Sequence, residues 1–150
     1  MDVELKTDIL LSSIKSISHR EVGEIADPEA RYRAEAGTEK ETLIKNCVCD
    51  GAAKLTHRLA RFLSSGYMRS ISNEPEWKEQ FVYSLDLSER RLANKAEPIM
   101  SEMQNFIIHY ALAKFYSTVS QSDLSNKHSL LTNDAAINLD NLIYTKQPPR

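Results

Sequence analysis

The stretch "EQFVYSLDL", residues 79–87, differs in its hydrophobic pattern from the rest of this 150-residue chain. Every second side chain in it is large and apolar: Phe81, Tyr83, Leu85 and Leu87. A period of two is typical of a half-buried strand, whereas most of the remaining sequence has the period near 3.6 that is typical of helices. Because a strand needs partners for its backbone N–H and C=O groups, the pattern also requires a second strand.

The nearest candidate for that second strand is "YMRSIS", residues 67–72, which is followed by the turn-forming residues "NEPE", 73–76. These segments together predict a β-hairpin insertion over residues 67–91. A two-stranded hairpin is only marginally stable alone. We therefore expect it to lie on a helical face or to be extended by a neighbouring chain.

The N-terminal half predicts helices. A first helix is expected from Asp2 to about Ser18, with one apolar stripe formed by Val3, Leu10, Ile14 and Ile17. A second begins at residue 27, where Asp27 is a suitable N-cap and Pro28 a suitable first residue, and Gly37 is its natural stop.

Residues 38–41, "TEKE", match a capping box and predict the start of a further helix that ends near Gly66. Its apolar face consists of Ile44, Val48, Leu55, Leu59 and Phe62. An alternative is that this helix and the one before it form a single long, kinked helix.

Two helices are expected after the hairpin. One runs from about Pro98 to Thr118, with a face formed by Ile99, Met103, Phe106, Tyr110 and Ala113. Ile107 and Leu112 widen that face, so we expect both side chains to be buried and the helix to be central. The last helix starts near 120–123 and ends before Pro148 and Pro149, with a face formed by Leu124, Leu131, Ala135, Leu142 and Ile143.

The predicted fold is therefore mainly α: one domain, 1–150, built as an antiparallel bundle of about four helices with a β-hairpin inserted between helices 2 and 3. A hydrophobic fraction of 41% and a charged fraction of 27% are ordinary for a globular protein. An extended C-terminal tail, residues 145–150, follows the last helix.

Charge and hydropathy limit the partners. With 19 basic and 21 acidic residues the net charge is −2, so no overall field attracts nucleic acid or an anionic membrane. No apolar run approaches the roughly 20 residues that cross a bilayer, and the acidic N-terminus "MDVELKTD" predicts no signal peptide. Cys47 and Cys49 lie two residues apart in a helical pattern, so that their side chains diverge and a disulfide between them is disfavoured. This favours a reducing, cytoplasmic setting.

No enzyme motif is present, and we expect no catalytic residue, no cofactor and no metal. Cys47, Cys49 and His57 are residue types that bind zinc, but their spacing does not bring four ligands together. His109, within "FIIHYAL", is predicted to be a satisfied core or interface histidine.

Lys54, Arg58 and Arg61 form a basic stripe at helical spacing, and a second basic cluster contains Arg90, Arg91 and Lys95. We interpret the stripe as a solvated helix face in which Asp50 pairs with Lys54. The alternative is that these residues contact the phosphates of a nucleic acid. Specific nucleic-acid binding is the less favoured interpretation.

Three segments carry a resemblance: "WKEQFVYSLDLSERR" (77–91), "PIMSEMQNFIIHYALAKFY" (98–116) and "NLIYTKQPPR" (141–150). Over residues 75–150 the chain resembles small uncharacterised structural proteins from the head–tail and tail gene modules of tailed bacteriophages and prophages of gut bacteria. The resemblance implies a non-enzymatic virion structural protein, made in the bacterial host cytoplasm. It favours a head–tail connector or adaptor (neck) subunit that forms a ring between portal and tail, over a tail terminator or another tail part.

The partners expected from this resemblance are further copies of the chain and neighbouring portal or tail components, with no membrane. The hairpin and the tail are the expected subunit interface: Trp77, Phe81, Tyr83, Leu85, Tyr144, Lys146, Pro148, Pro149 and Arg150. Two other classes stay open. One is a small helical regulatory module that binds protein or nucleic acid, and the other is an enzyme of unrecognised type.

Overall fold

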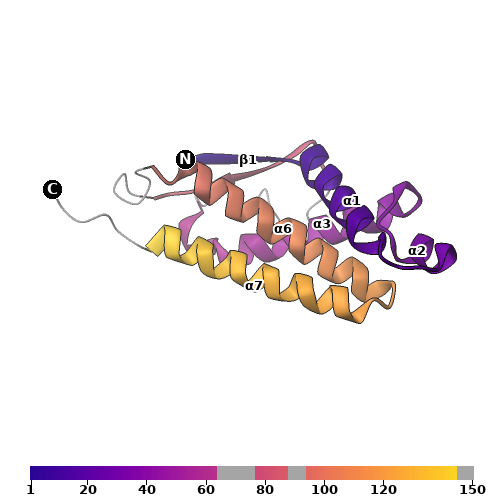
Figure 1. Cartoon of the computed structure of the whole chain (residues 1–150). Coiled ribbons are helices and arrows are strands. Elements are labelled where there is room, and N and C mark those ends of the chain that lie inside the picture. The colour runs from indigo at the N-terminus through magenta and orange to yellow at the C-terminus, as the bar shows by residue number, and fades with distance from the viewer. Residues whose placement is uncertain (64–76, 88–93, 145–150) are drawn as a thin grey trace.

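The computed structural model describes residues 1–63, 77–87 and 94–144. It is mainly helical, with a small two-stranded antiparallel sheet (Figure 1). In chain order the elements are β1 (Asp2–Lys6), α1 (Thr7–Val22), α2 (Pro28–Ala34), the 3₁₀ turn η1 (Thr38–Lys40), α3 (Glu41–Arg58), the 3₁₀ turn η2 (Ala60–Phe62), β2 (Gln80–Ser84), α6 (Ala96–Thr118) and α7 (Ser122–Tyr144).

The predicted strand at 79–87 is confirmed as β2, and its partner is β1, at the other end of the sequence. Val3 lies opposite Tyr83, and Leu5 lies opposite Phe81, so that both pairs put large side chains on one buried face. The expected start of the first helix at Asp2 is therefore wrong. Apolar and charged residues alternate over 2–6, and this local period of two outweighs the wider helical spacing from Val3 to Leu10.

Hydrogen bonds secure both ends of the sheet. The N-terminal ammonium of Met1 donates to the Leu85 carbonyl at 3.0 Å, and the Leu85 N–H donates to the Met1 carbonyl at 2.7 Å. At the other end the Thr7 N–H donates to the Glu79 carbonyl at 3.0 Å, and the Thr7 hydroxyl donates to Lys78 O at 2.6 Å. The first turn of α1 is thus fixed to the residues that lead into β2.

The second edge of β2 meets the chain that follows η2. Leu63 forms a single antiparallel bridge with Leu85, and the Asp86 N–H donates to the Phe62 carbonyl at 2.6 Å. Successive residues of a strand direct their hydrogen bonds to opposite edges, so this contact lies on the edge away from β1. The expected first hairpin strand (67–72) and its turn (73–76) lie outside the described residues, as do 88–91.

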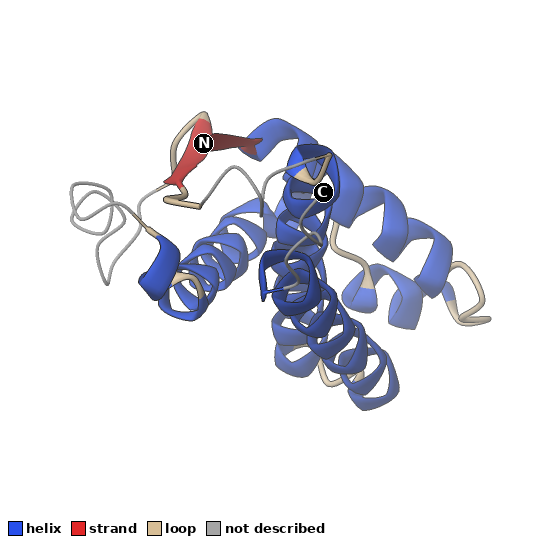
Figure 2. Ribbon diagram, turned by 90° about the vertical axis from the view of Figure 1, so that its left-hand side faces the viewer, coloured by secondary structure: helices blue, strands red, loops and turns tan. Residues whose placement is uncertain are grey.

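Helix α6 lies in the middle of the helices and contacts α7, α3, α1 and β1. In Figure 1, α7 runs beside α6 along its whole length, and Figure 2 places the sheet on one side of the helices. Ile107 and Leu112 are fully buried, which confirms the prediction for both. A helix that is apolar around most of its surface is explained by neighbours on several sides.

Gly51 allows α3 to approach α6 closely. A Cβ atom at this position would lie 3.3 Å from the Ile107 carbonyl oxygen and 3.3 Å from Cδ1 of Tyr110. Contacts this short are rare, and one of them is to backbone, which cannot rotate aside. The absence of a side chain at Gly51 therefore sets the distance between the two helices.

The N-terminal helices agree with the sequence in part. Asp27 accepts a hydrogen bond from the Glu29 N–H at 3.2 Å, and Pro28 opens α2, as predicted. The capping box at 38–41 is wrong, because these residues form η1 and α3 starts without a side-chain cap. A single kinked helix is also excluded, because the Ala36 N–H leaves the helical path and donates to the buried Ser18 hydroxyl at 2.8 Å.

Helix α7 has the predicted position but a rotated inner face. Ala135 and Ile143 are buried as expected, whereas Leu124, Leu131 and Leu142 are only partly covered. The residues that α7 buries are His128, Thr132, Ala135, Ala136, Leu139 and Ile143. Smaller and polar residues on this face allow α7 to lie close to α6.

Candidate functional site

The predicted subunit interface divides into buried and exposed members. Phe81, Tyr83 and Leu85 are enclosed by the core of the chain itself. The Tyr83 hydroxyl donates to the Ala52 carbonyl at 2.8 Å and so connects the sheet to α3, and burial raises the pKa of Tyr83. Trp77 is half-buried, with the Lys45 ammonium 5.1 Å from its ring centroid.

Tyr144 is 47% exposed at the end of α7, with its ring edge-on to Phe62 at a centroid distance of 5.3 Å. Its hydroxyl accepts a hydrogen bond from Arg61 at 3.2 Å. Lys146, Pro148, Pro149 and Arg150 lie outside the described residues. The interface thus stays a prediction, and among the described members Trp77 and Tyr144 are the ones with accessible surface.

The outer face of α7 carries a stripe of exposed apolar side chains. Leu130 is 65% exposed, Ile137 is 56% exposed, and Tyr144 lies a further seven residues on. Because seven residues are close to two helical turns, the three side chains lie on one side of α7, away from its buried face. We call Leu130, Ile137 and Tyr144 the α7 stripe.

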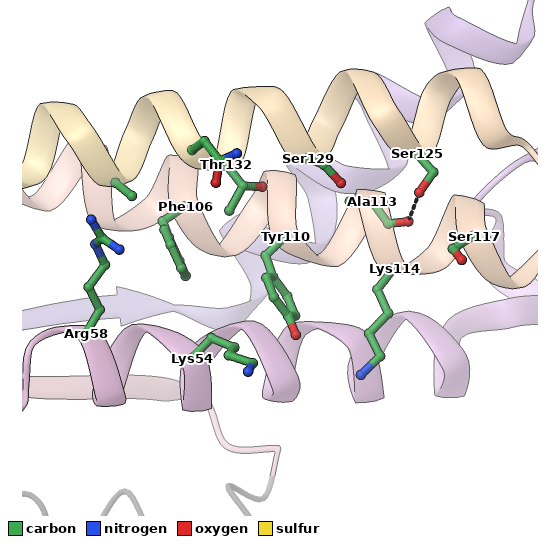
Figure 3. Close-up of a pocket in the computed structure, with 12 residues that line it drawn as sticks. Lys54, Arg58, Phe106, Tyr110, Ala113, Lys114, Ser117, Ser125, Ser129 and Thr132 are labelled. Atoms are coloured by element: carbon green, nitrogen blue, oxygen red, sulfur yellow. Dashed lines mark hydrogen bonds between the residues drawn. The ribbon is translucent and has the colours of Figure 1, made fainter.

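A groove of about 610 Å³ runs along α6 between α3 and α7 (Figure 3). Its floor holds Phe106 and Tyr110, whose rings are stacked with centroids 6.2 Å apart and planes inclined by 14°. The α3 wall and the floor contribute basic side chains, and the α7 wall contributes hydroxyl and amide groups. The polar residues that line it include Lys54, Arg58, Lys114, Ser129 and Asn133.

Ion pairs lie at both ends of this groove. Arg58 on α3 donates to Asp140 on α7 at 2.6 Å, and Lys114 on α6 donates to Asp50 on α3 at 2.6 Å. The predicted pairing of Asp50 with Lys54 is therefore wrong. Lys114 is the closer partner, because α6 packs tightly on α3 at this level, and the Asp50 carboxylate raises the pKa of Lys114.

The basic stripe, which runs from α3 into η2, is directed toward α7 in part, instead of only toward solvent. Arg58 and Arg61 bind Asp140 and Tyr144 on that helix. In the second basic cluster, Lys95 donates to the Leu142 carbonyl at 3.1 Å. Arg90 and Arg91 lie outside the described residues.

A partly buried polar cluster connects α1, α6 and α7. The His128 Nε2 lies 2.7 Å and 2.9 Å from the two carboxylate oxygens of Glu21, and the Nδ1 atoms of His128 and His109 are 2.9 Å apart. Tyr116 donates to Glu21 at 3.0 Å, and Lys127 donates to it at 2.6 Å. We call Glu21, His109, Tyr116, Lys127 and His128 the histidine cluster.

Burial and hydrogen bonding act in opposite directions on Glu21. Burial alone would raise its pKa, but hydrogen bonds from Lys127, His128 and Tyr116 outweigh burial and lower the pKa below its ordinary value. For His109 the two main effects agree. Burial and the adjacent His128 both disfavour the charged form of His109 and lower its pKa to about 4.

The histidine cluster connects α1, α6 and α7 through hydrogen bonds. The short Nδ1–Nδ1 contact requires that one ring carries the proton that the other ring accepts, so only one of these two nitrogens is protonated. A cavity of about 420 Å³ adjoins the cluster, bordered also by Arg20, Glu24 and Leu131. His109 is hydrogen-bonded, as predicted for a core or interface histidine, but it is half-buried and borders this cavity.

Sequence reasoning missed Glu21 and His128. His128 lies seven residues before Ala135 and four before Thr132, so the inner face of the last helix contained the signal. Glu21 had no comparable signal in the sequence. The first helix was expected to end at about Ser18, whereas the structure extends it to Val22.

The histidine cluster predicts a specific loss of stability in mild acid. The pKa of His109 falls from its ordinary 6.5 to about 4 on folding, so the unfolded chain binds the extra proton first. The free energy of unfolding should therefore decline by about 1–3 kcal/mol as pH falls from 6.5 to 4. The lowered pKa of Glu21 adds a further decline below about 4.5.

Urea denaturation at a series of pH values measures this decline. His109→Gln should flatten the curve between pH 6.5 and 4, whereas His57→Gln, an exposed histidine on α3, should leave it unchanged. Parallel curves for the wild type and His109→Gln would contradict the assignment.

The cysteines do not form a reactive site in this structure. Burial raises the pKa of Cys47 to about 11, and burial also raises the pKa of Cys49, so both thiols are protonated at neutral pH. Within residues 1–63, 77–87 and 94–144, no three His, Cys, Asp or Glu side chains are grouped to hold a metal ion.

Comparison with protein-family models, with curated proteins and with solved structures found no match to this chain. In the described part of the chain, no helix has the length and apolar character needed to cross a membrane.

Proposed function

We propose that this chain is a non-enzymatic structural subunit that assembles with copies of itself into the head–tail connector ring of a tailed-phage virion. The α7 stripe carries the proposal, since it places three large apolar side chains at seven-residue spacing on an outer helix face. Helices with this pattern commonly pack against a partner. The resemblance of residues 75–150 supplies the virion setting and the portal and tail proteins as neighbours.

A ring requires two different, complementary surfaces on each subunit. In this proposal the first is the α7 stripe, and the second is the basic tail, residues 145–150, of the adjacent copy. Asp123 and Asp134 are exposed on the side of the stripe, because they lie seven residues before and four residues after Leu130. Their carboxylates complement Lys146 and Arg150 of that tail.

The finer fold proposed with this function is an antiparallel helical bundle. The hairpin expected over 67–91 would add its first strand to the edge of β2 that Leu63 already bridges. In this arrangement β2 has a strand on both sides, so that its own edges are closed to pairing with other chains. The ring then forms through α7 and the tail.

The α7 stripe predicts a variant that separates assembly from folding. Replacing Leu130 and Ile137 together by glutamine should reduce the wild-type oligomer to a monomer, because the apolar contact area is lost. The circular dichroism spectrum should not change, since neither side chain is buried in the monomer. Light scattering after size exclusion measures the mass, and deletion of 145–150 should have the same effect.

The matched control is the pair Ile9→Gln and Tyr32→Gln, on α1 and α2, which are 46% and 56% exposed. This control should assemble as the wild type does. A single-chain mass for the wild type at every concentration, or equal assembly of the stripe variant and the control, would refute the proposal.

The second candidate function is a helical regulatory module that binds nucleic acid or protein. The groove between α3 and α7 favours it, because Lys54, Arg58 and Lys114 line it. A duplex-DNA affinity that falls steeply with salt, and that is lost when Lys54, Arg58 and Arg61 are reversed in charge, would support this candidate over the connector.

A further inference from the structure

The groove between α3 and α7 has a positive charge near its middle, Lys54, that no carboxylate among the described residues balances. Asp50, Lys54 and Arg58 lie on successive turns of α3, about 6 Å apart along the axis. Asp50 and Arg58 form ion pairs with α6 and α7 at the two ends of the groove. In the described residues Lys54 has neither an ion pair nor a hydrogen bond, and none of the groove-lining residues is acidic.

Neutral hydrogen-bonding groups surround this charge. The floor offers Tyr110, and the α7 wall offers the Ser129 hydroxyl and the Asn133 amide (Figure 3 labels Tyr110 and Ser129). Two other hydroxyls of that wall are already committed, since Ser125 donates to the Ala113 carbonyl and Thr132 donates to the His128 carbonyl, each at 2.8 Å. Tyr110, Ser129 and Asn133 thus line the groove together with Lys54.

We propose that this groove binds a small organic phosphate, with its phosphate group at Lys54. A phosphate presents three acceptor oxygens. They match donors on three sides of the groove, on α3, α6 and α7. A planar carboxylate would reach fewer of them. The stacked rings of Phe106 and Tyr110 provide an apolar floor for a flat group, and a volume of about 610 Å³ accommodates a nucleotide-sized molecule.

The ion pairs at the two ends of the groove limit the ligand to one anionic group. Arg58 and Lys114 already bind carboxylates of the chain, and these carboxylates repel a second anionic group nearby. A nucleoside monophosphate, which combines one phosphate, a hydroxyl-bearing sugar and a flat base, fits this combination. AMP is the appropriate probe.

Titration of the ¹⁵N-labelled full chain with AMP, followed by NMR, tests the proposal. AMP should produce saturable shifts in the amides around Lys54, Tyr110 and Ser129, and adenosine, which lacks the phosphate, should bind more weakly. Lys54→Met keeps most of the side-chain length at an exposed position and removes the charge. It should weaken AMP binding by about tenfold or more.

Lys6→Met on β1 is the matched control, because it makes the same charge change at an exposed lysine that does not line the groove. It should leave AMP affinity unchanged. Absence of saturable shifts in the wild type, or equal AMP binding by Lys54→Met, would overturn the proposal. Tighter, salt-sensitive binding of an oligothymidylate, or of an acidic peptide, at the same amides would also overturn it in favour of a macromolecular partner.

Discussion

Replacing Tyr83 by aspartate should unfold the chain or lower its free energy of unfolding by more than about 4 kcal/mol. The Tyr83 ring is fully buried opposite Val3 in the sheet, and its hydroxyl donates to the Ala52 carbonyl of α3. Aspartate would remove the ring and put an unpaired carboxylate between the sheet and the helices. Total stability is typically 5–15 kcal/mol, so this loss is a large fraction of it.

Two further variants separate the causes of that loss. Tyr83→Phe keeps the ring and removes the hydroxyl, and should cost about 1 kcal/mol, since the Thr56 hydroxyl still donates to the Ala52 carbonyl. Gln80→Asp makes an equivalent charge change on the other face of β2, opposite Lys6, and should have little effect. Thermal or urea denaturation followed by circular dichroism measures all three. Equal stability of Tyr83→Asp and Gln80→Asp would contradict the sheet register.

The second large effect is expected at Leu112, near the middle of α6. Leu112→Ala should cost about 2–5 kcal/mol, because the side chain is fully buried and its removal leaves a cavity in the central helix. Leu130→Ala makes the same chemical change at a site that is 65% exposed and should cost much less in the monomer. If the two variants have the same midpoint in urea at a concentration where the chain is monomeric, α6 is not the central helix.

The fold was predictable where one hydrophobic period dominated a long segment. The bounds of α6 and α7 follow from such patterns, and the burial of Ile107 and Leu112 follows from an apolar helix that needs neighbours on several sides. Residues 2–6 were predicted wrongly because a five-residue strand and the start of a helix share the spacing from Val3 to Leu10. The correct assignment depends on Phe81 and Tyr83, which are distant in sequence.

The sites were less predictable than the helices, since they depend on how helices meet. Lys54 and Arg58 were visible as a basic stripe, but their environment depends on α7 lying parallel to α3 across α6. Lys114 and Asp50 are 64 residues apart in sequence, and no local pattern indicates that they pair. The contact between His109 and His128 likewise requires the register of α6 against α7.

The pairing of β1 with β2 has a consequence for the order of events during translation. The ribosome makes β1 before β2, and α1, α2 and α3 are synthesised between the two strands, since Asp2 pairs with Ser84. The nascent chain therefore carries an unpaired strand edge until residues 80–84 have been made, and such edges pair readily with other chains. Asp2, Glu4 and Lys6 place a charged side chain at every second position of that strand, and charged side chains on an open edge disfavour its pairing with other chains until β2 arrives.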